Sequence, residues 1–219
     1  MRTAEVRRSG FSLVELAIAM TVTVALGGML ILALDSSMKA FRTGATATEV
    51  EATVAHAIDG IAERLKTSAV GMVAPTPPAG FFTTQLDFQA VIGFQNDAAV
   101  WGPPERIFLE YSPGELDDGI DNDQNGLVDE CRVVWVENPG TADERRIVLC
   151  NWVRETLEGE IPGNNADENG NGLDDEPGLC FDFDGNRVNI RLSIEQQSPE
   201  GFAIVRTLEK TISFRNATN

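Results

Sequence analysis

The hydrophobic residues follow one pattern in the first third of the chain and another in the rest. From Phe11 to Leu34 the sequence is almost continuously apolar, and Glu15 is the only charged residue in this run. As a helix rising about 1.5 Å per residue, the run is long enough to cross a hydrocarbon layer about 30 Å thick. Residues 11–34 are therefore predicted to form a transmembrane helix.

Helical periodicity continues through residues 35–73, which we interpret as an amphipathic extension of the same helix. Apolar and small residues recur there at steps of three and four, with charged residues on the other faces. The predicted stripe consists of Met38, Phe41, Ala45, Thr48, Ala52, Ala55, Ile58, Ile61 and Leu65. No proline interrupts the chain before Pro75, so one helix is expected from about residue 12 to residue 69.

After a proline-rich linker at residues 74–80, the pattern changes from helical to strand-like. Short segments rich in β-branched and aromatic residues are separated by Gly, Pro, Asn and Asp, which is typical of antiparallel strands. The predicted strands are 86–94, 106–111, 132–136, 145–153, 179–183, 187–197 and 201–216. The sequence thus predicts an α+β protein, in which a long N-terminal helix packs on an antiparallel β-sheet within a domain covering residues 81–219.

The residues around the start of the apolar run form a pattern of their own. The segment RRSGFSLVELAIAM, at residues 7–20, places a glycine ahead of the hydrophobic stretch, whereas a secretory signal peptide has its small cleavage residue after it. This segment resembles the type IV prepilin signal of pilins and of the pseudopilins of type II secretion systems. The resemblance implies that a prepilin peptidase removes the leader, residues 1–10, by cutting between Gly10 and Phe11, and then methylates the new amino terminus.

Glu15 stands at the fifth position of the expected mature chain, where the same family has an acid. A carboxylate inside a bilayer costs about 3 kcal/mol and needs a partner or a function. In the family this partner is the terminal amine of a neighbouring subunit, here that of Phe11, and the charge pair rewards correct axial register during assembly. The alternative is an ordinary signal anchor that happens to contain a glutamate.

The resemblance implies a pilin fold and a structural role rather than an enzymatic one. The expected function is that of a minor pseudopilin or minor pilin. The C-terminal hairpin predicted from strands 187–197 and 201–216 resembles the C-terminus of J-type pseudopilins and W-type minor pilins. Expected partners are other pilins or pseudopilins, the prepilin peptidase, an inner-membrane assembly platform and secreted substrates. The chain would cross a bacterial inner membrane once, with its amino end in the cytoplasm, before entering a periplasmic pseudopilus or a cell-surface filament. The second candidate is a calcium-dependent adhesin or substrate-recognition module at the tip of a type IV pilus.

The chain is strongly acidic, with a formal net charge of −17, and the acidity is concentrated in two segments. Residues 115–130 hold seven carboxylates and residues 160–176 hold six, and neither segment contains Lys or Arg. Such a chain offers no electrostatic attraction to nucleic acid, so no nucleic-acid partner is expected. The sequence also lacks a Ser-His-acid arrangement, a phosphate-binding glycine loop and Cys-His zinc spacing, and no enzymatic activity is expected.

The acidic segments contain two copies of one motif, DNDQNGLVDE at 121–130 and DENGNGLDDE at 167–176, within loops that we delimit as 117–130 and 164–176. Alternating oxygen ligands, a glycine at the sharp turn, a backbone carbonyl and closing carboxylates suit a hard cation such as Ca²⁺. The motif resembles the first half of the EF-hand loop and the calcium loops of dockerins and thrombospondin type 3 repeats. The candidate ligands are Asp121, Asp123, Asn125, Leu127, Asp129, Glu130, Asp167, Asn169, Asn171, Leu173, Asp175 and Glu176, the two leucines through their carbonyl oxygens.

We expect two calcium ions in a structural role. At matched positions the first loop offers four carboxylates and the second three, so the first is predicted to bind more tightly. At the twelfth position, where an EF-hand has its closing glutamate, stand Arg132 and Gly178, so Glu130 and Glu176 or aspartates preceding the motif would close the site. The alternative is a pair of solvated acidic turns, since Asp, Asn and Gly are ordinary turn residues.

Three cysteines allow at most one internal disulfide in an exported domain. Cys131 and Cys150 are equidistant from a turn near Gly140, so a hairpin at 131–153 would place them opposite each other and allow a disulfide. Cys180 is an alternative partner for either, and a fully reduced state is the third alternative.

Overall fold

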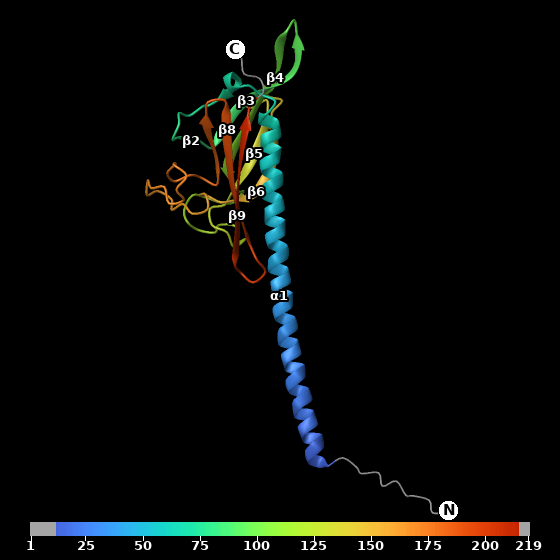
Figure 1. The fold of residues 1–219 in the computed structure, drawn as a ribbon. Helices are drawn as coiled ribbons and strands as arrows, with labels where there is room; N and C mark the ends of the chain where they lie inside the picture. The colour runs from blue at the N-terminus through green and yellow to red at the C-terminus, as the bar shows by residue number, and fades with distance from the viewer. Residues whose placement is uncertain (1–11, 215–219) are drawn as a thin grey trace, which may run out of the picture. The chain divides into compact units, whose positions relative to one another are not determined.

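The structure, a computed structural model, describes residues 12–214 and divides into two compact units. The first unit ends at Gly44 and contains the first part of helix α1, which runs from Leu13 to Leu65. The second unit begins at Ala45 and contains the rest of α1, the short 3-10 helix η1 (Val70–Met72) and, within the described residues, nine strands (Figure 1). The predicted α+β class is confirmed.

Helix α1 begins with a capping box formed by Ser12 and Glu15. The Ser12 N–H donates to Oε2 of Glu15 at 3.0 Å, and the Glu15 N–H donates to Oγ of Ser12 at 3.2 Å. These reciprocal bonds satisfy two of the amides that a helix leaves unpaired at its start. From Leu13 to Leu34 every large apolar side chain of the helix is exposed, and by length and composition this stretch can cross a membrane.

The second part of α1 contributes to the hydrophobic core of the second unit. Its buried residues are Val50, Val54, Ala57, Ile58, Ile61, Ala62 and Leu65. The predicted stripe is right from Ile58 onward and wrong before it, because Ala52 is exposed whereas Val50 and Val54 are buried. Valine removes more apolar surface from water than alanine does, which favours the observed face.

The sheet is antiparallel in every described pairing. Its strands are β1 (Val73–Ala74), β2 (Phe82–Thr83), β3 (Gln85–Gln95), β4 (Ala98–Tyr111), β5 (Cys131–Glu137), β6 (Arg145–Val153), β7 (Leu179–Asp184), β8 (Arg187–Gln197) and β9 (Ala203–Ser213). Their order is β1-β3-β4-β5-β6-β8-β7-β2, with β9 also paired to β8. Strand β8 therefore pairs with β9 along one edge, and with β7 and then β6 along the other.

The sequence predicts the seven longer strands and misses β1 and β2, which have two residues each and no alternating pattern of their own. Strands β6 and β8 have the predicted bounds. Strand β4 begins at Ala98, well before the predicted residue 106, and includes Pro103 and Pro104. These prolines are tolerated because the β3–β4 ladder shifts register between Gln89 and Gly93, where an amide donor is dispensable.

Residues of α1 and of the sheet share one core. Leu65 of α1, Leu86 of β3, Ile107 of β4, Phe181 of β7 and Ile190 of β8 are completely buried in it. At the margin of the core, the Arg64 guanidinium lies over the ring of Trp135 at 4.1 Å from its centroid. The helix is thus an integral part of the domain from Val50 onward, although its first part is exposed.

Cys131, Cys150 and Cys180 are free and buried. The predicted β5–β6 hairpin is confirmed but its register is not, because Cys131 pairs with Val153 and Cys150 with Val133. Register shifts on both sides of Val133 displace the two cysteines from each other, as an extra residue in one strand does. The cross-strand geometry that favoured a Cys131–Cys150 disulfide is therefore absent.

Candidate metal centre

The two acidic motifs lie in two long loops, which leave the sheet beside each other in Figure 1. The first loop joins β4 to β5, and the second joins β6 to β7. Each is closed at its base by the same backbone bond: the Ser112 N–H donates to the Glu130 carbonyl at 2.9 Å, and the Leu157 N–H donates to the Glu176 carbonyl at 2.8 Å. The bond in the first loop thus holds Glu130 at the end of the β4–β5 pair. The bond in the second loop holds Glu176 between β6 and β7, which both pair with β8 rather than with each other.

Inside each loop the motif's first aspartate folds the backbone around itself. The Asp121 carboxylate accepts the N–H groups of Asn125 at 3.1 Å and Gly126 at 2.9 Å. In the second loop the Asp167 carboxylate accepts those of Asn171 at 3.1 Å and Gly172 at 2.8 Å. Both loops therefore adopt the same turn, as the matched register of the sequences predicts.

The left-handed backbone positions recur in the same order, which extends the duplication beyond the motif. The matched pairs with positive φ are Gly114 and Gly159, Gly119 and Asn165, Gln124 and Gly170, Gly126 and Gly172, and Asp129 and Asp175. At several of these positions a non-glycine residue accepts the strained conformation, which the surrounding hydrogen bonds must compensate. The two loops thus share their left-handed positions, apart from Gly163, which has a positive φ in the second loop only.

Four glutamates are buried where the loops close. Glu115 and Glu130 of the first loop are 5% and 3% exposed, and Glu160 and Glu176 of the second are 7% and 0% exposed. Carboxylate oxygens of Glu115, Asp123 and Glu130 lie within 4.8 Å of one another. Buried carboxylates are rare unless they are paired or bind a cation, so these clusters could hold a metal ion.

Three buried oxygens of these glutamates have no hydrogen-bond partner among the described residues: Oε2 of Glu130, Glu160 and Glu176. The opposite oxygen of each is satisfied. Oε1 of Glu130 accepts the Nδ2 amide of Asn125 at 2.7 Å, Oε1 of Glu176 accepts that of Asn171, and Oε1 of Glu160 accepts the Asn169 N–H at 3.1 Å. An unpartnered buried carboxylate oxygen is costly, and a bound cation would satisfy it.

The electrostatics of the loops follow from this burial. Loss of water raises the pKa of Glu130 and of Glu160 above the usual range of a carboxyl, and the neighbouring Glu176 charge adds to the rise at Glu160. The Gly172 N–H, followed by those of Gly170 and Asn171, lowers the pKa of Asp167. Backbone amides thus stabilise the anionic form of Asp167, whereas burial disfavours the anionic forms of Glu130 and Glu160.

The carboxylates of Asp129 and Asp175 accept hydrogen bonds from backbone amides of their own loops. The Asp129 carboxylate accepts the N–H groups of Asp118 at 3.3 Å and Gly119 at 2.8 Å. The Asp175 carboxylate accepts those of Asn164 at 3.2 Å and Asn165 at 2.7 Å. Asp129 also lies in a second acidic cluster, with Asp117 and Glu155.

The sequence motif does not include two of the buried glutamates, Glu115 and Glu160. Both precede the motif, and in the structure Oε1 of each accepts the N–H of the motif's third residue, at 2.8 Å from Asp123 and at 3.1 Å from Asn169. The signal that could have found them is the repeated Gly-Glu-Leu/Ile run at residues 114–116 and 159–161. One extra residue separates it from the motif in the second loop, which hides the repeat in an ungapped alignment.

The twelfth position of each motif has another role. In the first loop Arg132 pairs with Glu110 at 2.6 Å on the sheet. In the second, a Cβ at Gly178 would collide with the carbonyl oxygen of Arg154, so only glycine fits there. Neither position therefore supplies the closing glutamate of an EF-hand.

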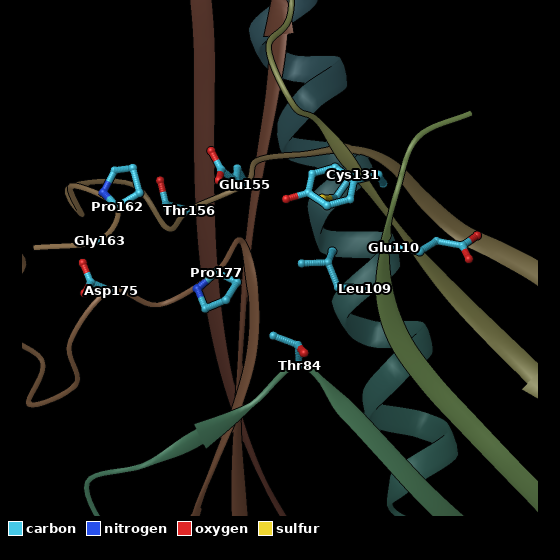
Figure 2. A pocket seen from close by; sticks show the side chains of 11 residues that line it. Thr84, Leu109, Glu110, Cys131, Glu155, Thr156, Pro162, Gly163, Asp175 and Pro177 are labelled. Carbon is cyan, nitrogen blue, oxygen red and sulfur yellow. The ribbon is translucent and has the colours of Figure 1, made fainter. Parts of the chain in front are cut away.

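A cavity of about 300 Å³ separates the second loop from β4 and β5 (Figure 2). Thr156, Pro162, Gly163 and Asp175 of the loop line one side, while Leu109 and Cys131 of the strands line the other. Of its carboxylates, Asp175 accepts backbone amides and Glu110 pairs with Arg132 and Arg146, whereas Glu155 faces the acidic cluster with Asp117 and Asp129. Burial raises the pKa of Cys131 to about 12, so its thiol is protonated at neutral pH and is a poor nucleophile.

The predicted processing and assembly residues lie at the other end of the chain. Gly10 and Phe11 fall outside the described residues. Glu15 is exposed at the start of α1 and takes part in the capping box with Ser12. Within the described part of the apolar run it is the only charged residue. Comparisons with models of protein families, with curated proteins and with solved structures give no match for the chain.

Proposed function

We propose that the chain is a minor pseudopilin or minor pilin, a subunit assembled into a filament through its N-terminal helix. The observation that carries the proposal is the division of α1. One continuous helix is packed into a domain core from Val50 to Leu65, yet exposes all its large apolar side chains from Leu13 to Leu34. A continuous apolar surface of this kind requires lipid or other apolar helices around it.

The sequence ahead of this helix supports the same proposal. Gly10 precedes the apolar run, and the only charge within the run is Glu15. After cleavage the helix would retain one acid in a lipid environment, where it needs a cationic partner. The amine of Phe11 from a neighbouring copy provides that partner, and extraction from the membrane into a helical filament keeps the apolar surface covered. The filament would belong to a type II secretion system or to a type IV pilus.

Calcium is the cation that the acidic loops fit best. Their ligands are carboxylate, amide and carbonyl oxygens in an irregular arrangement supplied by the protein, which suits Ca²⁺ better than the octahedral preference of Mg²⁺. The role we propose is structural. A bound ion would neutralise the like charges of each loop and hold the ends of β4, β5, β6 and β7 in place.

A second candidate function is a filament-displayed binding module, in which the loops contact a ligand. The observation that favours it is the apolar surface carried by the acidic loops. Leu116, Ile120, Val128 and Ile161 are between 53% and 61% exposed. A calcium-dependent surface or glycan ligand would support this function, whereas copurification with other pilins or pseudopilins would support the tip subunit.

The experiment for the assembly role must separate charge pairing from helix capping, because Glu15 does both. Glu15→Gln keeps a side chain that can complete the capping box but removes the charge. We expect this variant to be processed normally and to be recovered in sheared filaments at about a tenth of the wild-type yield or less. The matched control is Glu49→Gln, at an exposed position of the same helix, with wild-type yield expected. Wild-type incorporation of Glu15→Gln would contradict the assembly role.

A further inference from the structure

We infer that each acidic loop binds its cation between two buried glutamates, Glu115 with Glu130 in the first loop and Glu160 with Glu176 in the second. This inference rests on the proposed calcium binding and identifies its ligands. Two of these four residues precede the motif, and all four are at least nine-tenths buried. Among the other acids of the two loops only Asp129 is buried as deeply.

The unpartnered oxygens carry the inference. Oε2 of Glu130, Glu160 and Glu176 is buried without a hydrogen bond in the described residues. Folding normally avoids burying an anion without a partner, since removing its water costs several kcal/mol. The same orphan at equivalent places of two loops, Glu130 and Glu176, indicates one missing partner of positive charge at each place.

In the first loop the glutamates face a third carboxylate. Ligand oxygens of Glu115, Asp123 and Glu130 lie within 4.8 Å of one another. The Nδ2 amide of Asn125 donates to Asp123 Oδ2 at 3.0 Å and to Glu130 Oε1 at 2.7 Å, so a weak positive dipole already stands among the three anions. A cation would stabilise this arrangement far more strongly than the amide does.

The second loop repeats the arrangement with one charge fewer. Asn171 donates its Nδ2 amide to Glu176 Oε1, as Asn125 does to Glu130. Glu160 accepts the N–H of Asn169, as Glu115 accepts that of Asp123. Because Asn169 replaces the aspartate, the second site holds two carboxylates where the first holds three, and it is the weaker site.

Asp129 and Asp175 are then positioning residues rather than ligands. Each accepts two consecutive backbone amides of its own loop with its two carboxylate oxygens, and neither belongs to the cluster of Glu115, Asp123 and Glu130. Glu115 also accepts two amides, from Asn122 at 3.5 Å and from Asp123 at 2.8 Å, but its carboxylate lies within that cluster. Those bonds hold the segment that follows the buried glutamate against the closing end of the loop. Substitution there should weaken the loop without removing its ion.

Calcium binding to the full-length chain in detergent micelles, measured by equilibrium dialysis with calcium alone, tests the assignment. We expect two ions per wild-type chain with unequal dissociation constants. Glu115→Gln should weaken the tighter site about 100-fold, and Glu160→Gln should weaken the other by a similar factor. Asp129→Asn, and the control Glu158→Gln at an exposed position of the second loop, should retain both ions.

A variant that binds calcium more tightly cannot owe its effect to unfolding. Asn169→Asp should tighten the weaker site about tenfold, because it restores the third carboxylate. Two ions with unchanged constants in Glu115→Gln and Glu160→Gln would overturn the ligand assignment while leaving calcium binding in place. Absence of binding to the wild-type chain would overturn calcium binding and this inference together, without bearing on assembly through Glu15.

Discussion

The apolar part of α1 and the acidic loops present opposite departures from an ordinary soluble domain. Between Leu13 and Leu34 the helix exposes the side chains that water-soluble proteins cover, while the loops bury Glu130, Glu160 and Glu176 with an oxygen left unpartnered. Both arrangements cost free energy unless a further component is bound. The chemistry of each indicates what is missing: an apolar environment for the helix and a cation for the loops.

The two regions need different structural support. An uncovered apolar surface can be carried by a bare helix, because all its backbone hydrogen bonds are internal. A cluster of buried anions needs a scaffold, and here each loop is closed at its base by a backbone bond, Ser112–Glu130 in the first loop and Leu157–Glu176 in the second. The first region can therefore act in assembly, and the second can stabilise the domain.

Removal of calcium should have the largest effect on stability, because it acts on the acidic loops and not on the apolar part of α1. With calcium at about 100 times its dissociation constant, each ion contributes about 2.7 kcal/mol to the free energy of unfolding. Since 1 kcal/mol shifts the melting temperature of a domain this size by about 2–4 °C, a chelator should lower it by about 10–20 °C. Differential scanning calorimetry of the full chain in detergent measures this shift. An unchanged melting curve would remove calcium as a fold element, and recovery with magnesium alone would contradict the choice of ion.

A second test compares the buried and the exposed parts of α1 by their effects on stability. Leu65→Ala, at a completely buried position, should lower the free energy of unfolding by about 2–5 kcal/mol through lost transfer energy and a cavity. The matched control Leu32→Ala lies in the exposed stretch of the same helix and should leave the domain's stability within about 0.5 kcal/mol. Denaturant titration of both variants provides the comparison. Equal losses would mean that the exposed stretch also belongs to the core.

A smaller effect concerns the buried charges in the absence of calcium. The pKa of Glu130 and of Glu160 is raised in the folded chain, so both bind protons more tightly there than when unfolded. Their ionised forms therefore destabilise the calcium-free fold above the raised pKa, and the penalty fades as the pH falls through it. The double variant Glu130→Gln, Glu160→Gln in chelator should be more stable than the wild type by about 1 kcal/mol at pH 7.5, and by progressively less towards pH 4. A stability gain that is independent of pH would show that ionisation of these glutamates is not its cause.

A last prediction concerns the rate at which the three cysteines are alkylated. Burial raises the pKa of Cys131, Cys150 and Cys180 to about 12, so at pH 8 almost no thiolate is present in the folded domain. Alkylation by iodoacetamide should be slow in the presence of calcium. Chelation should accelerate it first at Cys131, which follows Glu130 directly, as mass spectrometry of the modified peptides would show. Uniform rates at the three cysteines after chelation would contradict a local opening of the first loop.

Much of this organisation follows from local sequence pattern. The helix, the seven longer strands and the repeated turn are visible in the sequence because each depends on residues close together in the chain. The register of the β5–β6 hairpin cannot be predicted from the sequence, because it depends on register shifts around Val133 that no turn residue specifies. The buried side of α1 at Val50 and Val54 depends on which face meets the sheet.

The candidate metal centre shows the same division. Asp121 and Asp167 are recognisable from the motif because their contacts are with the next few residues. Glu115 and Glu160 lie outside it, and only the folded loop brings Glu115 to Asp123 and Glu130. Burial decides which acids lack a partner, and burial is a property of the packed loop rather than of its composition.

The intact mass of the protein isolated from the cell that makes it distinguishes a processed filament subunit from an unprocessed chain. A filament subunit drawn from a prepilin begins at Phe11 with a methylated amine, retains Glu15 and lacks residues 1–10. An intact leader, or an amino terminus beyond Leu34, would contradict the claim that α1 assembles the chain into a filament.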